Sequence, residues 1–165
     1  IRAELDPARR TAYLDDLEAC VTAHSATYET GNPVLDTILT AKAQYCLASQ
    51  ITFTCMADGA ALGRIHPMDL ATILGNALDN AIVAASAAPQ GKRFVDLDLR
   101  CEDGQLLLLV SNTFGRPPRM VDGMPVTRHA GHGFGTKSIK LAVERMNGNC
   151  QFRINGDRFE LRAVM

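Results

Sequence analysis

The chain has 165 residues, of which 47% are hydrophobic and 21% are charged, so it is long enough for one ordinary domain and too apolar to be disordered. Its 17 Lys and Arg residues are balanced by 18 Asp and Glu residues, which argues against a general nucleic-acid-binding protein, since such a protein carries a basic face. Purely apolar runs such as residues 106–110 are too short to cross a membrane.

The five cysteines are scattered through the chain and form no CxxC pair. An odd, scattered set of this kind predicts reduced thiols rather than a disulfide framework or a zinc site. The sequence starts at Ile1, without an initiator methionine, and shows no signal peptide, so we expect it to be part of a longer protein.

Two helices are predicted at the start of the chain. Apolar residues at helical spacing predict the first over residues 8–25. Its apolar stripe is narrow, which favours pairing with another helix, such as one from a second subunit. Asn32 followed by Pro33 is a typical cap and first turn, and predicts a second helix that runs to about Ser49.

A strand, a helix and a hairpin follow. Alternating apolar residues predict a strand over Ile51–Met56. A third helix is predicted to begin at Pro67 and to end before the turn at residues 88–91. Two further strands, Arg93–Cys101 and Gln105–Asn112, are separated by a short Glu-Asp-Gly turn, which is typical of a hairpin.

The last third of the chain begins with a segment rich in glycine and proline. Residues 113–130 predict one long loop with no core of its own, a form typical of a lid over a binding site. A helix over Thr136–Met146, closed by Gly148, and a hairpin of Cys150–Ile154 and Arg158–Val164 complete the chain. This order predicts an α+β fold, a two-layer sandwich in which helices cover one face of a mostly antiparallel mixed sheet.

Two polar motifs interrupt these apolar patterns. Asn76 and Asn80 lie four residues apart on one face of the third helix, opposite a continuous apolar face. Two neighbouring carboxamides on a mostly uncharged helix suit the binding of a metal or a phosphate. The glycine-rich segment Gly131–Gly135 runs directly into the next helix, which is a common way to bind phosphate. Together these motifs predict nucleotide chemistry.

The motifs and their order resemble the Bergerat-fold (GHKL) ATPase superfamily of gyrase, chaperones, mismatch-repair proteins and histidine kinases. NALDNA at Asn76–Ala81 is similar to the asparagine box of that superfamily, and GHGFG at Gly131–Gly135 is similar to its second glycine box. Within the superfamily, the chain looks most like sensor histidine kinases of the peptide quorum-sensing class. That similarity rests on GNPVLDTILTAK at Gly31–Lys42, the SNTF ending of a strand at Ser111–Phe114, and the short lid.

The resemblance covers residues 31–165 well and residues 1–30 more loosely. It therefore implies a catalytic ATP-binding domain over residues 31–165. For residues 1–30 it implies the second helix of a dimerisation and phosphoacceptor element. The phosphoacceptor histidine itself would lie on a helix before residue 1.

The resemblance also implies ATP and Mg²⁺ as ligands. Asn80 matches the asparagine that holds magnesium, an ion that prefers oxygen ligands. Asn76 stands where the hydrolysing members and the related serine kinases carry a glutamate that polarises the attacking group. An amide cannot accept a proton, whereas a histidine acceptor needs no such base, so Asn76 favours phosphoryl transfer to histidine. The alternative is that Asp69 or Asp79 supplies the base.

The first glycine box departs from the usual DxGxG pattern, because the matching residues 112–116 read NTFGR. The resemblance implies that Asn112 accepts the adenine amino hydrogen through its amide oxygen, which is a weaker acceptor than a carboxylate. No catalytic side chain is identified. The other implied nucleotide-binding residues are Asn76, Asn80, Gly131, His132, Gly133, Phe134, Gly135 and Thr136. The basic residues that are candidates to reach a γ-phosphate are Arg116, Arg119, Arg128 and Lys137.

The function implied is the catalytic domain of a sensor histidine kinase. Such a domain transfers the γ-phosphoryl group of Mg-ATP to a histidine on an upstream helix, for relay to a response regulator. The resemblance further implies a homodimer through the N-terminal helices, and a cytoplasmic domain whose membrane attachment lies only in missing upstream segments. Two other functions stay open: a serine kinase or ATPase of the same fold, and a non-catalytic nucleotide-binding interaction module.

Overall fold

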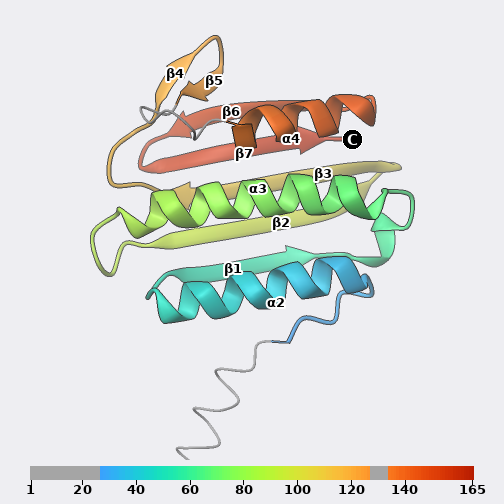
Figure 1. Cartoon of the computed structure of the whole chain (residues 1–165), viewed down its shortest axis with the longest axis horizontal. Coiled ribbons are helices and arrows are strands. Elements are labelled where there is room, and N and C mark those ends of the chain that lie inside the picture. The colour runs from blue at the N-terminus through green and yellow to red at the C-terminus, as the bar shows by residue number, and fades with distance from the viewer. Residues whose placement is uncertain (1–26, 127–133) are drawn as a thin grey trace, which may run out of the picture.

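The computed structural model describes residues 27–126 and 134–165, and the helix predicted over residues 8–25 lies outside these ranges. A five-stranded sheet forms one layer, and three α-helices form the other (Figure 1). The elements in chain order are α2 (Pro33–Ala48), β1 (Thr52–Ala57), the 3₁₀-helix η1 (Ala60–Leu62), α3 (Pro67–Ser86), β2 (Phe94–Glu102), β3 (Gln105–Thr113), β4 (Arg119–Val121), β5 (Met124–Val126), α4 (Phe134–Arg145), β6 (Asn149–Asn155) and β7 (Arg158–Val164).

The strand order of the main sheet is β1-β2-β3-β7-β6. β1 and β2 are parallel, because the chain crosses over through η1 and α3 between them. The other three neighbouring pairs are antiparallel. The sheet is therefore mixed but mostly antiparallel, as the sequence predicts.

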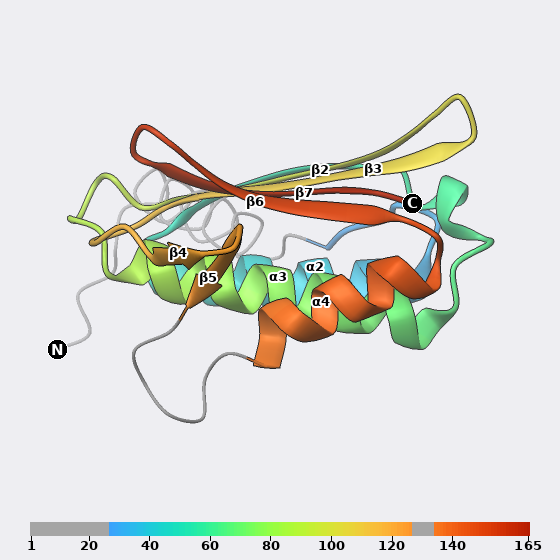
Figure 2. The ribbon, with the colours of Figure 1, turned by 90° about the horizontal axis from the view of Figure 1, so that it is seen from above.

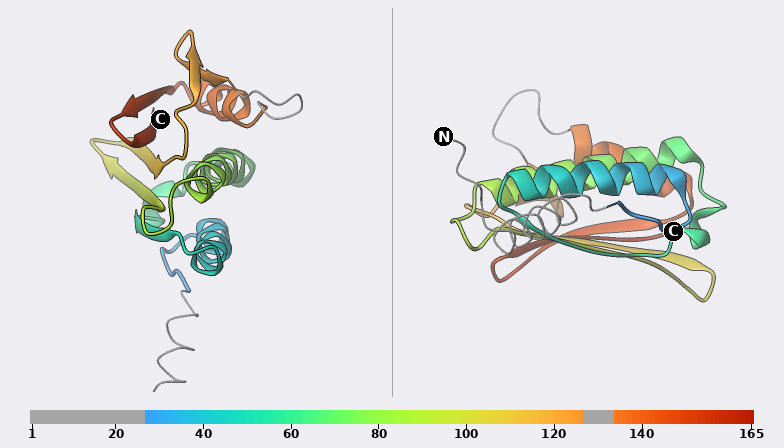
Figure 3. Two further views of the ribbon diagram at one scale, coloured as in Figure 1. Left: turned by 90° about the vertical axis from the view of Figure 1, so that its left-hand side faces the viewer. Right: turned by 90° about the horizontal axis from the view of Figure 1, so that it is seen from below.

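The three helices lie side by side on the same face of the sheet (Figures 2 and 3). α3 is central and packs on β2 and β3, while α2 packs beside β1 and α4 beside β6. The residues predicted to form the apolar face of α3 are all buried: Leu70, Leu74, Ala77, Leu78, Ala81 and Ala85. They meet alternate residues of β2 and β3, such as Val95 and Val110, in one continuous core. The predicted two-layer Bergerat fold is confirmed.

Capping residues fix where the helices begin. Asn32 Oδ1 accepts hydrogen bonds from the backbone N–H groups of Val34 and Leu35, both at 3.1 Å, which confirms the predicted start of α2. α3 begins at Pro67 as predicted, and His66 Nδ1 accepts a hydrogen bond from the N–H of Met68 at 3.2 Å. The cap gives His66 a structural role, which the sequence alone did not assign.

The end of α4 differs in detail from the sequence prediction. Asn147, not Gly148, adopts the left-handed conformation, with φ of 57°. Gly148 is required for another reason, because a Cβ atom there would lie 2.4 Å from the carbonyl oxygen of Val164. The glycine therefore lets the chain pass close to the end of β7.

The prediction of one loop without structure over residues 113–130 is wrong. β4 and β5 form a small separate hairpin that projects from one end of the molecule (Figure 1). Asp122 and Gly123 have φ of 50° and 74°, the positive pair of a type I′ turn. An Asp-Gly dipeptide between short apolar stretches is itself a hairpin signal, and the density of prolines around it obscured that signal. Residues 127–130 lie outside the described ranges.

The segment before α2 packs against the rest of the domain. Asp36 Oδ1 accepts hydrogen bonds from the backbone N–H of Thr30 at 2.8 Å and from its hydroxyl group at 2.6 Å. A Cβ atom added to Gly59 would lie 2.3 Å from Thr30 Oγ1, so only glycine allows this approach. The ring of Tyr28 meets the ring of Phe53 edge-on, with 6.4 Å between centroids. Residues 28–32 are therefore an integral part of the packed domain.

Candidate nucleotide-binding site

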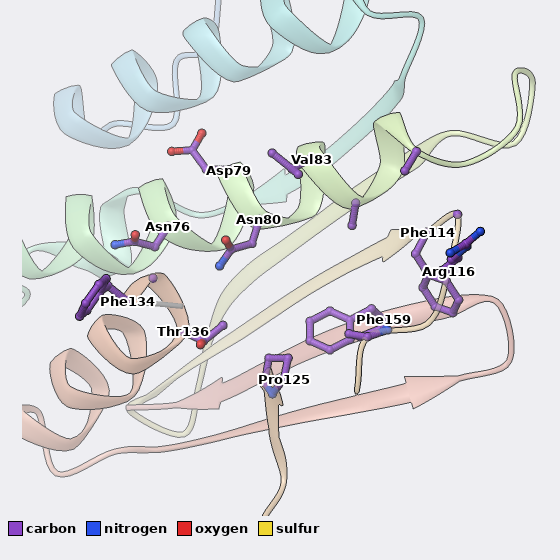
Figure 4. A pocket seen from close by; sticks show the side chains of 15 residues that line it. Asn76, Asp79, Asn80, Val83, Phe114, Arg116, Pro125, Phe134, Thr136 and Phe159 are labelled. Carbon is purple, nitrogen blue, oxygen red and sulfur yellow. The ribbon is translucent and has the colours of Figure 1, made fainter. Parts of the chain in front are cut away.

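A cavity of about 770 Å³ opens beside the C-terminal half of α3. Its other walls come from the start of α4, from β5, from β7, and from the segment that follows β3 (Figure 4). Its size and its mainly apolar lining with a few polar groups are typical of small-molecule sites. Its lining residues are Asn76, Asp79, Asn80, Val83, Ala84, Ala87, Phe114, Gly115, Arg116, Pro118, Pro125, Phe134, Gly135, Thr136 and Phe159.

The two asparagines of α3 both line this cavity, as their spacing predicts. The Asn76 Nδ2 group donates a hydrogen bond to the carbonyl oxygen of Thr72 at 2.7 Å, which uses one of its two amide hydrogens. Its Oδ1 atom and the second amide hydrogen are left to face a ligand. Figure 4 shows Asn76 and Asn80 directed toward the start of α4, whereas Asp79 points to the other side of α3.

Gly135 brings the start of α4 against this asparagine pair. A Cβ atom added to Gly135 would lie 3.1 Å from Asn76 Oδ1, 3.2 Å from Asn80 Nδ2 and 3.5 Å from Asn80 Oδ1. Contacts of 3.1–3.2 Å are tight for a methyl group, so the missing side chain is what leaves both carboxamides in place. An alanine here would have to displace the carboxamides by a few tenths of an ångström.

The N-terminal turn of α4 faces the cavity. Phe134, Gly135 and Thr136 all line it, and the backbone N–H groups of a first helical turn have no partner within the helix. These groups and the helix dipole attract anions such as phosphate. Three more of the predicted phosphate-binding residues, Gly131, His132 and Gly133, lie outside the described ranges.

Asn112 lies deeper, at the end of β3. Its side chain is buried, and a narrow cavity of about 20 Å³ joins it to Asn80, Thr136 and Phe159, which also line the main cavity. The Asn112 Nδ2 group donates to the carbonyl oxygen of Thr113 at 2.8 Å. This bond uses one amide hydrogen and leaves Oδ1 as the acceptor of the side chain, and Asn112 itself does not line the 770 Å³ cavity.

Sequence reasoning missed the apolar wall of the cavity. Phe159 stands opposite Asn112 in the pairing of β7 with β3, so the same sheet register that buries Asn112 brings Phe159 to the site. Nothing in the local sequence distinguishes it from an ordinary core residue. Gly115 has a clearer signal, since it lies in the altered first glycine box. A Cβ atom at Gly115 would lie 2.2 Å from the carbonyl oxygen of Ala87, so glycine lets this segment pack on the end of α3.

Charged side chains are few at the site. Among the described lining residues, Asp79 is the single carboxylate, and it is paired with Lys42 of α2 at 2.5 Å. Asp69 does not line the cavity and is paired with Arg145 of α4. Of the candidate basic residues within the described ranges, Arg116 lines the cavity, whereas Arg119 and Lys137 do not. Arg128 lies outside the described ranges.

The side chains of Asn76 and Asn80, which face the start of α4, are neutral amides. Within the described part of the chain, no group of three or more His, Cys, Asp or Glu side chains is arranged to hold a metal ion. A single carboxamide oxygen suits Mg²⁺, which usually takes its other ligands from phosphates and water.

No helix in the described part of the chain is long and apolar enough to cross a membrane.

Residues 65–165, which include both asparagines, Asn112 and the start of α4, match the GHKL domain family. The chain belongs to that family. GHKL domains generally bind ATP and Mg²⁺. Among curated proteins, none matches the sequence of this GHKL domain.

Solved structures show the same fold at low sequence identity. The catalytic domain of the histidine kinase ThkA has a TM-score of 0.65 and 14% identity, and the match covers 80% of this chain and 90% of that one. The mycobacterial sensor histidine kinase MprB has a TM-score of 0.56 and 20% identity, with 80% and 92% covered. The Acinetobacter baumannii histidine kinase AdeS has a TM-score of 0.58 and 11% identity, with 98% and 85% covered. At these identities, the similarity demonstrates the GHKL fold.

Proposed function

We propose that this GHKL domain is the ATP-binding catalytic domain of a sensor histidine kinase. The observation that carries the proposal is the meeting of Asn76, Asn80 and Gly135 at one end of a 770 Å³ cavity. A neutral oxygen ligand for a cation and an anion-binding helix start lie next to each other there. Mg-ATP has the complementary chemistry, a divalent cation held on a chain of phosphates.

Each part of the nucleotide has a proposed partner in this arrangement. Asn80 holds the magnesium ion, which when bound neutralises phosphate charge and aligns the γ-phosphoryl group. The first turn of α4, together with Gly131, His132 and Gly133, binds the phosphates. The Asn112 amide oxygen accepts a hydrogen from the adenine amino group, and Phe159 supplies an apolar surface for the base.

Among the described residues that line the cavity, none is placed as a general base, and this favours histidine as the phosphoryl acceptor. Asn76 carries an amide that cannot take a proton, and Asp79 is engaged by Lys42 on the far side of α3. A hydroxyl group or water needs such a base, whereas a neutral imidazole has a lone pair ready to attack. That lone pair forms the new N–P bond while the bond from the γ-phosphorus to the bridging oxygen breaks and releases ADP.

The same proposal extends to the kinase class, the domain boundaries and the partners of the protein. The motifs at Gly31–Lys42 and Ser111–Phe114 support membership of the peptide quorum-sensing class. We infer a catalytic domain over residues 31–165, a dimerisation helix within residues 1–30, a homodimer, and phosphoryl relay from the upstream histidine to a response regulator. The domain would then work in the cytoplasm, with any membrane anchor upstream.

Calorimetric titration of ATP, with and without Mg²⁺, tests the binding site. We expect magnesium-dependent binding that Asn80→Ala weakens by about 10-fold or more, since a metal or charge-assisted contact contributes roughly 1.5–3 kcal/mol. Asn149→Ala removes an exposed amide from β6, away from the cavity, and is expected to leave binding unchanged. Absence of binding at millimolar ATP would reject the proposed site in this chain.

A transfer assay separates the kinase from its alternatives. Incubation with γ-labelled ATP and a supplied phosphoacceptor helix pair should give an acid-labile phosphohistidine. Asp79→Asn should leave transfer intact, because we assign no proton transfer to that carboxylate. Release of phosphate by the wild-type chain would favour the ATPase, and an acid-stable product would favour the serine kinase, provided that Asp79→Asn abolishes the reaction. Nucleotide binding without any transfer would favour the interaction module.

A further inference from the structure

A second cavity, of about 640 Å³, lies at the opposite end of the sheet from the candidate nucleotide site. The turn around η1, the tip of the β2–β3 hairpin and the C-terminal end of the described chain gather at that end, far from β4 and β5 (Figure 2). None of its lining residues lines the 770 Å³ cavity. Its lining residues are Ala60, Ala61, Gly63, Arg64, Ile65, Cys101, Gly104, Leu106, Met146 and Met165.

Most of this lining is apolar and adaptable. Leu106 is buried at the sheet, and Ile65, Met146 and Met165 are partly buried and pack against the core. Methionine side chains are flexible and polarizable, so they adjust to ligands of irregular shape. The cavity is within the size range of small-molecule sites. It therefore offers an apolar chamber to a ligand with a hydrocarbon body.

The described residues that line this cavity include one cationic side chain, that of Arg64. Arg64 is exposed and lines the cavity. The ion pairs formed between residues of the described ranges involve other basic side chains, and none includes Arg64. A guanidinium group presents several N–H donors in a fork that matches the two oxygens of a carboxylate.

We propose that this cavity is a binding site for a small organic anion with an apolar body, such as a medium-chain carboxylate. The anionic group pairs with Arg64, and the hydrocarbon body lies among Ile65, Leu106, Met146 and Met165. The site is separate from the proposed nucleotide site and does not depend on the kinase function. A neutral ligand of the same shape would fill the chamber without satisfying Arg64, and an anion without an apolar body would leave the chamber empty.

Methionine methyl NMR of the whole 165-residue chain tests the site directly, with octanoate as the probe. Met146 and Met165 line the cavity, whereas Met56 and Met68 are exposed elsewhere and Met120 lies in the β4–β5 hairpin. Octanoate is expected to shift the Met146 and Met165 signals in a saturable way. Octanoate is expected to leave the other methionine signals in place, whether or not Mg-ATP is present.

Two variants separate the charged contact from general hydrophobic binding. Arg64→Gln is expected to weaken octanoate binding by about 10-fold, because it replaces the cation with a shorter, neutral polar side chain. Arg153→Gln removes an equivalent charge from β6, outside the cavity, and is expected to have no effect. Octanol is expected to bind more weakly than octanoate. Equal affinity for octanol and octanoate, or an unchanged affinity in Arg64→Gln, would overturn the proposal.

Cys101 provides a second test that needs no substitution of Arg64. It is exposed and lines the cavity, so an N-ethylmaleimide adduct at its sulfur would occupy space needed by the ligand. Alkylation of the wild-type chain is expected to reduce octanoate binding by at least 10-fold. The same treatment of Cys101→Ser is expected to leave binding unchanged. Saturable shifts that persist fully in the alkylated wild-type chain would also overturn the proposal.

Discussion

Gly135→Ala adds one methyl group where α4 meets the asparagine pair. The methyl carbon would lie 3.1 Å from Asn76 Oδ1 and 3.2 Å from Asn80 Nδ2, a few tenths of an ångström closer than an ordinary contact. The backbone of Gly135 lies in the first turn of a helix and has no positive φ, so alanine fits the local conformation. The strain therefore falls on the two carboxamides and not on the helix.

The two effects of this substitution have opposite signs. Replacing glycine by alanine in a helix stabilises it by up to about 1 kcal/mol. Each carboxamide is proposed to make a charge-assisted contact with Mg-ATP that contributes roughly 1.5–3 kcal/mol. A small displacement of both carboxamides would weaken these contacts only in part, with a total loss of about 1–3 kcal/mol in binding free energy. We expect a thermal midpoint that is unchanged or slightly higher, with affinity for Mg-ATP lowered roughly 5- to 150-fold.

Calorimetry and thermal unfolding of the same preparations measure both effects. Gly75→Ala is a matched control, because Gly75 is also helical, precedes Asn76, and has no heavy atom within 4 Å of an added Cβ. It should raise stability and leave nucleotide affinity unchanged. Wild-type affinity in Gly135→Ala would refute the reasoning, and so would an equal loss of affinity in Gly75→Ala.

Two further predictions concern packing and thiol chemistry. Gly59→Ala should lower the free energy of unfolding, measured in urea, by about 1–3 kcal/mol, because the added methyl group would overlap Thr30 in the segment before α2. Gly63→Ala is the control and should have little effect, because Gly63 is exposed and has no heavy atom within 4 Å of an added Cβ. Burial raises the pKa of the Cys46 and Cys55 thiols to about 11, so both stay protonated at pH 8 and form thiolates only as the pH approaches 11. Of the cysteines in the described ranges, iodoacetamide at pH 8 should therefore label the exposed Cys101 first, as measured by peptide mass spectrometry. Early labelling of Cys46 would contradict this.

The regular elements could be predicted because their signals are local. The cap at Asn32, the apolar face of α3 and the Asp-Gly turn at residues 103–104 depend on residues that lie within a few positions of one another. The β4–β5 hairpin carried a similar Asp-Gly signal, but the neighbouring prolines pointed to an irregular loop. Local signals in conflict are resolved by packing, and Met120 and Met124 of this hairpin pack against the core.

The asparagine pair could be predicted, whereas most of the cavity around it could not. Asn76 and Asn80 share a helix, so their spacing alone places them on one face. Phe159 reaches the site only because β7 pairs with β3 in a register that sets it opposite Asn112. That register depends on contacts between residues almost fifty positions apart, and no short window of sequence contains them.

The sequence by itself determined the α+β class, the face of α3 that is buried, the pair of amides and the glycine-rich start of α4. These follow from helical and strand periodicity and from the conformational preferences of asparagine, proline and glycine. Only the tertiary structure decided which residues meet: Gly135 with both asparagines, Gly115 with Ala87, and Arg64 with the apolar residues of the second cavity. The physical reason is that periodicity specifies the direction of a side chain on its own element, whereas close packing between elements specifies its neighbours.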